Sequence, residues 1–187
     1  MISQEVHNAF EVIKNGGIIL YPTDTVWGIG CDATNPEAIS KIYALKKRSE
    51  SQSMIVLMNG EKMMYNVFKD IPEVAWQILD LSEKPTTLIL DNPRNVAPNI
   101  IAPDKTLAIR LVKEPFCFKL LERMKKPLVS TSANISGQPT PASFKEISPE
   151  IIAGVDYVVN LDRDKMGGKP SAIIKLTGDS QVKIIRK

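Results

Sequence analysis

Three groups of polar residues have types and spacings that could carry chemistry. The first is a run of cations, Lys46, Lys47 and Arg48, at the end of a segment with helical spacing. Guanidinium and ammonium donors suit the oxygens of a polyphosphate. Cations near a helix end also complement the helix dipole, so the run alone fits a solvated helix end as well as a phosphate clamp.

The second group centres on Arg110, which lies between Ile109 and Leu111 in an alternating segment. The two-residue repeat puts Thr106 and Arg110 on one strand face. A charge in a half-buried strand needs a partner, and an anionic ligand carboxylate is a natural one if the side chain faces a cavity. An exposed sheet face is the alternative.

The third group is the segment 130–137, which is crowded with hydroxyl and amide side chains. It overlaps the end of an apolar strand pattern at 128–132, and α/β proteins usually bind ligands at strand ends. The strand repeat puts Ser130 and Ser132 on one face. Turn and capping roles are the alternative for any one of these side chains.

Histidine, cysteine and carboxylate chemistry has little support. The sequence has one histidine, His7, and its two cysteines, Cys31 and Cys117, form no C-x-x-C pair. These counts argue strongly against zinc clusters and histidine-dependent triads. No carboxylate pair stands out for acid–base catalysis, because the candidates lie in separate turn-like stretches at Asp24, Asp32 and Asp91.

Two glycine-containing segments imitate nucleotide-binding motifs without meeting their requirements. Residues 28–33 resemble a dinucleotide fingerprint, but six residues separate them from the preceding strand pattern. Residues 168–171 resemble the end of a P-loop, but Pro170 replaces the hydroxyl residue. Neither segment predicts a phosphate-binding loop.

Composition predicts an ordinary globular protein. The 187 residues include 43% apolar and 24% charged side chains, which predicts one domain over residues 1–187. No apolar run approaches the ~20 residues of a membrane span and no secretion signal is present, so we expect a cytoplasmic protein with no membrane partner. The net charge of +3 permits a nucleotide or RNA partner without requiring one.

Hydrophobic spacing predicts a mixed α/β fold. Helical patterns cover residues 3–14, 35–48, 72–81 and 115–124. Strand patterns cover residues 17–21, 54–58, 86–90, 106–112, 128–132 and 155–159, with a terminal hairpin of 172–176 and 182–186 around a loop at 177–180. Residues 17–58 fit a β-α-β unit, which predicts two parallel strands.

Four ordered segments carry a family resemblance. Residues 21–28, 46–48, 107–110 and 130–137, together with Pro170-Ser171 and Ile185-Arg186, closely resemble the YrdC family of threonylcarbamoyl-AMP synthases. The order and spacing match over essentially the whole chain. The resemblance implies a twisted, open mixed sheet flanked by helices, with a large basic cavity. Larger members carry a second domain, and this chain is similar to the single-domain form.

The same resemblance implies an activity and its partners. It implies an L-threonylcarbamoyladenylate synthase that condenses L-threonine, bicarbonate or CO2, and ATP to threonylcarbamoyl-AMP and pyrophosphate. The product serves N6-threonylcarbamoyladenosine formation at position 37 of tRNAs that read ANN codons, through a downstream threonylcarbamoyl transferase complex. Mg2+ is expected with ATP, with no ligands assigned.

The resemblance also implies roles for individual residues. Threonine contacts are implied for Thr23, Arg110, Ser130 and Ser171. Contacts to ATP and its phosphates are implied for Lys46, Arg48, Thr106, Ser132, Asn134, Thr140 and Arg186, with Lys46 and Arg48 as the catalytic cations. The strand repeat supports part of this set independently, because it puts Thr106 and Arg110 on the same face.

Two positions depart from the family pattern. Gln52 replaces a basic residue or histidine that is common near the substrate. Ala172 stands where a threonine usually follows Ser171. These departures bear on the contacts to threonine and phosphate more than on the reaction.

Two other functions compete with the synthase. A non-catalytic protein that binds double-stranded RNA or tRNA could use the same basic cavity, but aromatic residues total only 6% and none repeats near Lys46. A carbamoyl-adenylating domain of hydrogenase-maturation proteins is the second rival. Those proteins are longer, with acylphosphatase and zinc-finger regions that this sequence lacks.

Overall fold

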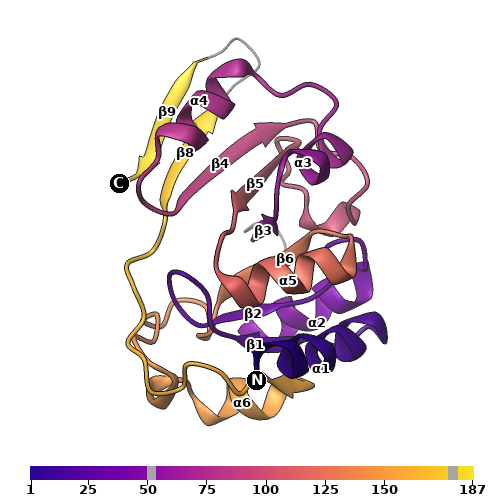
Figure 1. The fold of residues 1–187 in the computed structure, drawn as a ribbon, viewed down its shortest axis with the longest axis vertical. Helices are drawn as coiled ribbons and strands as arrows, with labels where there is room; N and C mark the ends of the chain where they lie inside the picture. The colour runs from indigo at the N-terminus through magenta and orange to yellow at the C-terminus, as the bar shows by residue number, and fades with distance from the viewer. Residues whose placement is uncertain (50–53, 177–180) are drawn as a thin grey trace.

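A computed structural model describes residues 1–49, 54–176 and 181–187 (Figure 1). The departure at Gln52 and the loop at 177–180 lie outside the described residues. The strands are β1 (Ile19–Tyr21), β2 (Gly28–Gly30), β3 (Ile55–Met58), β4 (Thr86–Asp91), β5 (Thr106–Leu111), β6 (Leu128–Ser132), β7 (Tyr157–Val158), β8 (Ala172–Leu176) and β9 (Val182–Arg186).

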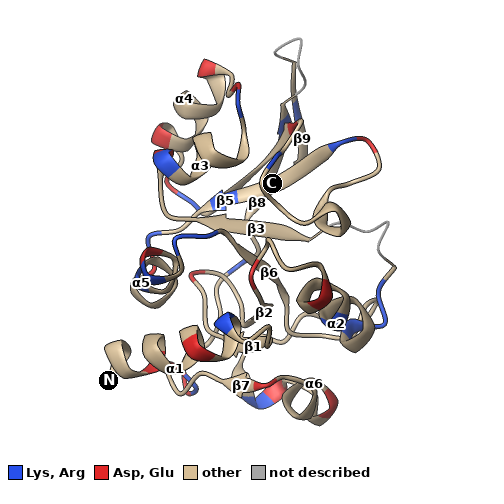
Figure 2. Cartoon of the chain, turned by 90° about the vertical axis from the view of Figure 1, so that its right-hand side faces the viewer, with Lys and Arg blue, Asp and Glu red and all other residues tan. Residues whose placement is uncertain are grey.

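The helices lie on both sides of the strands. They are α1 (Ile2–Lys14), α2 (Pro36–Lys46), α3 (Glu61–Val67), α4 (Glu73–Leu81), α5 (Pro115–Met124) and α6 (Pro149–Gly154), with short 3-10 turns at Pro98–Ile100 and Phe144–Glu146. Figure 2 shows α1 and α5 on one side of the strands and α2 and α6 on the other. None of the helices in the described part of the chain is long and apolar enough to span a bilayer.

The described strands form one mixed sheet in the order β7-β1-β2-β6-β3-β5-β4-β8-β9. Both parallel and antiparallel neighbours occur, for example β3 with β5 and β4 with β5. The sheet twists strongly between β1 and β9, and the segment before β8 runs along one side of the molecule to reach it (Figure 1). The predicted open mixed sheet flanked by helices is confirmed.

The predicted β-α-β unit has a different topology. β1 pairs antiparallel with β2, and β2 and β3 each pair antiparallel with β6. The two predicted strands, β1 and β3, therefore run in opposite directions, and the prediction of a parallel pair is wrong. The chain reverses in the loop 22–27 and forms the three-residue β2, so the strands connected through α2 are β2 and β3.

Local signals explain the start of α2, which carries the cation run at its end. The Asn35 side chain accepts hydrogen bonds from the backbone N–H groups of Glu37 and Ala38, and Pro36 occupies the first turn. The helix ends where Lys47 adopts a left-handed conformation with φ of 51°. Arg48 therefore follows the helix rather than extending it.

Strand register gathers the polar residues on one face of the sheet. Ser130 lies opposite Ile55, and Ile55 lies opposite Ala108. Side chains directly opposite each other share a face, and so do side chains two residues apart. Arg110 and Ser132 therefore lie on the same face as Ser130.

Candidate active site

This polar face forms the floor of a cavity of about 240 Å³. Its walls come from the loop after β1, from β2, β3, β5 and β6, from the segment before β8, and from β9. The lining residues are Thr23, Thr25, Val26, Gly28, Arg48, Met54, Ile55, Arg110, Ser130, Thr131, Ser132, Thr140, Pro170, Ser171, Ile173 and Arg186. The described lining contains three arginines and no aspartate or glutamate, so it favours anionic ligands.

Most of the predicted site residues meet in this cavity. Those that line it are Thr23, Arg48, Arg110, Ser130, Ser132, Thr140, Ser171 and Arg186. Lys46, Thr106 and Asn134 are not among its described lining residues. Ala172, one of the two departures from the family pattern, is also absent from the lining and begins β8.

Lys46 is buried beneath the end of β6. Its side chain is 1% exposed, and its ammonium donates hydrogen bonds to the carbonyl oxygens of Ser132 and Asn134. Burial first, and the neighbouring charge of Arg48 second, lower the pKa of Lys46 from 10.5 to about 8. A solvated helix end is therefore the wrong interpretation for Lys46, although it describes Lys47, whose exposed ammonium pairs with Glu150 at 2.8 Å.

Arg48 reaches the cavity from the segment after α2. Its side chain is half-buried and lines the cavity. Burial lowers the pKa of its guanidinium from the ordinary value. Arginine stays protonated at physiological pH, so Arg48 contributes a fixed positive charge to the cavity wall.

Thr106 and Asn134, which do not line the cavity, form hydrogen bonds within the chain. Thr106 Oγ1 donates to the Asp104 carboxylate at 2.7 Å. Asn134 Nδ2 donates to the carbonyl oxygens of Ile135 and Gln138 at 3.0 and 2.7 Å. The Asn134 Oδ1 atom is buried and has no hydrogen-bond partner among the described residues.

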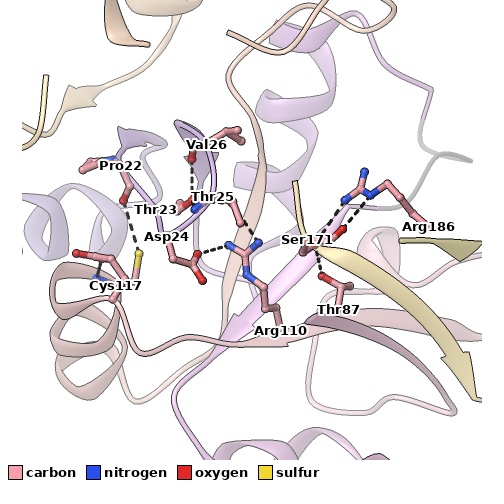
Figure 3. Close-up of polar contacts among 11 residues, drawn as sticks. Pro22, Thr23, Asp24, Thr25, Val26, Thr87, Arg110, Cys117, Ser171 and Arg186 are labelled. Atoms are coloured by element: carbon pink, nitrogen blue, oxygen red, sulfur yellow. Dashed lines mark hydrogen bonds and ion pairs between the residues drawn. The ribbon is translucent and has the colours of Figure 1, made fainter. Parts of the chain in front are cut away.

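Arg110 lies on the cavity floor with a partner from within the chain. The residue is 3% exposed, so the alternative of an exposed sheet face is wrong. Its Nη2 atom donates to Asp24 Oδ1 at 2.9 Å, and Nη1 donates to Thr25 Oγ1 at 3.2 Å. Figure 3 shows the guanidinium under the loop that carries both acceptors. The predicted need for a partner is confirmed, and the protein supplies one in Asp24, whereas the contact with a ligand carboxylate stays a prediction.

Hydrogen bonds fix the shape of that loop. Thr23 Oγ1 accepts a hydrogen bond from the backbone N–H of Thr25 at 3.0 Å and donates to the carbonyl oxygen of Val26 at 2.7 Å. The backbone N–H of Gly168 donates to the carbonyl oxygen of Thr25. The loop is therefore held internally and by the segment before β8.

The opposite wall contains Ser171 and Arg186 (Figure 3). Ser171 Oγ forms a hydrogen bond with the hydroxyl of Thr87, a fully buried residue of β4, at 2.8 Å. Arg186 Nε donates to the Ser171 carbonyl oxygen at 2.9 Å, and Arg186 Nη2 donates to Ser171 Oγ at 3.4 Å. Ser171 thus connects β4 with the terminal strand β9.

Glycine in β2 keeps the floor of the cavity open. A Cβ atom at Gly28 would lie 3.2 Å from Ser130 Oγ and 3.5 Å from Thr23 Cγ2. Gly28 lines the cavity, so a side chain at this position would enter the space beside Ser130 and Thr23.

Sequence comparison decides the family. A family model for Sua5, YciO and YrdC proteins, described as telomere recombination, matches residues 11–187. The chain belongs to this Sua5/YciO/YrdC family. A relative from Acinetobacter baumannii strain ATCC 17978, named threonylcarbamoyl-AMP synthase, is 32% identical over 187 residues, covering 96% of this chain and 98% of the relative. The predicted family resemblance is confirmed.

Solved structures of the Sua5/YciO/YrdC family have the same fold. The structure of Pyrococcus abyssi Sua5 in complex with L-threonine has a TM-score of 0.80 and 26% identity, covering 91% of this chain. The chain spans 50% of that Sua5 chain. The crystal structure of Escherichia coli YciO has a TM-score of 0.85 and 24% identity, covering 98% of this chain and 89% of the YciO chain. This similarity shows that the two proteins share a fold.

Sequence reasoning missed three residues whose side chains contact predicted site residues: Asp24, Thr25 and Thr87. Asp24 and Thr25 lie within the segment that carries the resemblance, but their side chains had no predicted role. Thr87 lies in a predicted strand with no motif. Arg110 and Asp24 are 86 residues apart in the sequence, so no local pattern could have paired them.

Proposed function

We propose that this chain is an L-threonylcarbamoyladenylate synthase, which joins L-threonine, bicarbonate or CO2, and ATP into threonylcarbamoyl-AMP and pyrophosphate. Membership of the Sua5/YciO/YrdC family and the similarity to a relative named threonylcarbamoyl-AMP synthase support the proposal. The likeness to a Sua5 structure that contains L-threonine supports threonine as the amino acid.

One observation of the site carries the proposal. Arg48, Arg110 and Arg186 face one cavity together with serine and threonine hydroxyl groups. The substrates bring one amino-acid carboxylate and one polyphosphate, and guanidinium groups bind both with charge-assisted hydrogen bonds. A cavity with three fixed cations and no described carboxylate in its lining suits that pair of anions.

We assign the two substrates to different groups of lining residues, which meet where Arg186 contacts Ser171. Threonine takes the group of Thr23, Arg110, Ser130 and Ser171, with its carboxylate toward the guanidinium of Arg110. ATP takes the group of Arg48, Ser132, Thr140 and Arg186, with its phosphates toward Arg48 and Arg186. Lys46 contributes indirectly in this arrangement, because its ammonium holds the carbonyl oxygens of Ser132 and Asn134.

The reaction needs no covalent bond to the enzyme. The threonine amine bonds to the carbon of CO2 and loses a proton, or reacts with bicarbonate and releases water, which gives a carbamate. A carbamate oxygen then bonds to the α-phosphorus of ATP while the bond from that phosphorus to the bridging oxygen breaks. Pyrophosphate leaves with the bridging oxygen. Holding the carbamate and the α-phosphate in line, with cations near the leaving pyrophosphate, supplies the catalysis.

Mg2+ enters the proposal as part of the MgATP substrate. No group of three or more histidine, cysteine, aspartate or glutamate residues in the described ranges could hold a metal ion. Mg2+ usually keeps several waters and binds substrate phosphates with few protein ligands. We therefore assign no protein ligand to it, and no step above depends on one.

The proposal includes the use of the product. Threonylcarbamoyl-AMP is an activated acyl adenylate, which a downstream threonylcarbamoyl transferase complex would use to modify adenosine 37 of tRNAs that read ANN codons. We place both steps in the cytoplasm. The basic cavity supports a nucleotide ligand at least as well as RNA, so direct tRNA binding is secondary in this proposal.

Pyrophosphate release from ATP tests the proposed reaction. Purified protein with bicarbonate and Mg2+ is compared in the presence of L-threonine, in the presence of L-serine, and without an amino acid. We expect release that depends on L-threonine and is weaker with L-serine. Release that is equal under all three conditions, or absent from all of them, contradicts the proposal, and absence favours the RNA-binding alternative.

A further inference from the structure

The ion pair between the buried Arg110 and the partly exposed Asp24 carries an inference that rests on the proposed function. Arg110 is 3% exposed and Asp24 is 25% exposed at the side chain, and their atoms are 2.9 Å apart. A buried guanidinium without a counter-charge is costly, so a partner is expected. Asp24 is the carboxylate that fulfils this need among the described residues.

The geometry fixes the orientation of the guanidinium as well as its charge. Asp24 accepts from Nη2 and Thr25 accepts from Nη1, so both terminal nitrogens of Arg110 are held by one loop. The Nε atom of Arg110 is buried and has no hydrogen-bond partner among the described residues. Without the loop, no hydrogen bond from the described residues would fix the plane of this group.

The loop can hold this orientation because it is itself anchored. Thr23 closes it with hydrogen bonds to Thr25 and Val26, and Gly168 donates to the Thr25 carbonyl oxygen. Asp24 is not among the described residues that line the cavity, whereas Arg110 is. Asp24 therefore acts on a ligand through Arg110 rather than by touching it.

We propose that Asp24 is a positioning residue that orients the Arg110 guanidinium for the carboxylate of L-threonine and so sets the affinity for the amino acid. A planar guanidinium binds a carboxylate well only when its N–H groups point toward the carboxylate oxygens. Asp24 accepts a hydrogen bond from Nη2 and Thr25 accepts one from Nη1, and the remaining N–H groups of the Arg110 guanidinium stay available to a ligand. The amino acid meets donors that are already oriented.

The test compares Asp24→Ala and Asp24→Asn with the wild-type protein in the pyrophosphate-release assay. For Asp24→Ala we expect the KM for L-threonine to rise about tenfold, because the guanidinium loses its fixed orientation. The KM for ATP and kcat at saturating L-threonine should stay within about twofold of wild type. Asp24→Asn keeps an oxygen acceptor for Nη2, so it should recover most of the affinity.

Asp32→Asn is the matched control. Asp32 also forms an ion pair, with Lys126 at 2.7 Å, but it does not line the cavity. Its substitution should leave the KM for L-threonine unchanged. Thermal unfolding of each variant separates lost affinity from lost folding, and Thr25→Ala, which removes the second contact to Arg110, replaces Asp24→Ala if that variant does not fold.

The outcomes separate this inference from the proposed function. Wild-type release that depends on L-threonine, together with an unchanged KM in Asp24→Ala, overturns the role of Asp24 alone. Equal increases in the KM for L-threonine and for ATP also overturn it, because they indicate a general structural defect. Wild-type protein without threonine-dependent release overturns both the proposed function and the inference.

Discussion

Four cations in and around the cavity differ in burial. Lys46 and Arg110 are buried, whereas Arg48 is half-buried and Arg186 is exposed. The two buried cations have partners within the protein, which are carbonyl oxygens for Lys46 and the partly exposed carboxylate of Asp24 for Arg110. Arg186 contacts Ser171 from a strand whose residues are all exposed.

The difference in burial indicates two roles for positively charged side chains around this cavity: support of the fold and contact with a ligand. A buried charge must be compensated by the protein, so Lys46 and Arg110 contribute to the structure, and of these two only Arg110 lines the cavity. A cation near the rim, such as Arg48 or Arg186, keeps contact with water. It can replace its hydrogen bonds to water by hydrogen bonds to phosphate oxygens without leaving a buried group unpaired. We therefore expect substitutions in the two regions to change different measured quantities.

The largest effect should come from Arg48→Ala. Loss of one preorganised cation at the leaving pyrophosphate should lower kcat about 100- to 1000-fold. Circular dichroism and thermal unfolding should show an intact fold. Lys47→Ala is the matched control, because Lys47 is a neighbouring exposed cation that pairs with Glu150 and does not line the cavity. Wild-type turnover in Arg48→Ala would contradict the phosphate role.

Lys46→Met should instead lower stability. Removal of the ammonium leaves the carbonyl oxygens of Ser132 and Asn134 without this donor, which should cost about 2 to 3 kcal/mol of unfolding free energy. Denaturant unfolding measures it. Lys41→Met, on the exposed side of the same helix, is the control and should change the free energy little.

The pH dependence of the Lys46→Met effect gives a second check. The folded-state pKa of Lys46 is about 8, below the ordinary value of 10.5, so the unfolded chain binds more protons between these values. Stability from this group therefore rises with pH across that window. The difference in unfolding free energy between wild type and Lys46→Met should grow from pH 8 to 10, and a constant difference would contradict the lowered pKa.

Arg110→Ala should act mainly on the amino acid. Loss of the charge-assisted contact to the threonine carboxylate should raise the KM for L-threonine about 10- to 100-fold, with a much smaller change in the KM for ATP. Steady-state kinetics with each substrate varied in turn measures both constants. An unchanged KM for L-threonine would show that Arg110 serves the fold alone.

Arg186→Ala should have the smallest effect. Because Arg186 is exposed and screened by water, its loss should raise the KM for ATP about 3- to 5-fold and leave the KM for L-threonine nearly unchanged. Lys183→Ala on the same strand is the control, since Lys183 is exposed and does not line the cavity. A loss of activity as large as that of Arg48→Ala would contradict the expectation that the exposed Arg186 contributes less than the half-buried Arg48.

Local sequence signals predicted the elements that carry the site. The cap at Asn35 with Pro36 predicted the start of α2. The alternation around Arg110 predicted the strand β5 but left open whether Arg110 faces the cavity or solvent. Both signals depend on neighbours within a few residues, which a sequence displays directly. The strand at 128–132 and the terminal hairpin were predicted for the same reason.

Features that depend on distant residues were not predictable in the same way. β2 consists of Gly28, Ile29 and Gly30, and glycine gives a weak strand signal, so the chain reversal before α2 was missed. The helix α3 was also missed because it is only seven residues long. The burial of Lys46 depends on packing against the end of β6, which no pattern near residue 46 reveals.

Isotope incorporation tests the central claim most directly. Purified protein is incubated with ATP, Mg2+, L-threonine and 13C-bicarbonate, and the nucleotide products are analysed by mass spectrometry. The account predicts a threonine-dependent adenylate that carries threonine and one 13C atom, formed together with pyrophosphate. ATP consumption that yields AMP or ADP without a labelled threonyl adduct would contradict the account.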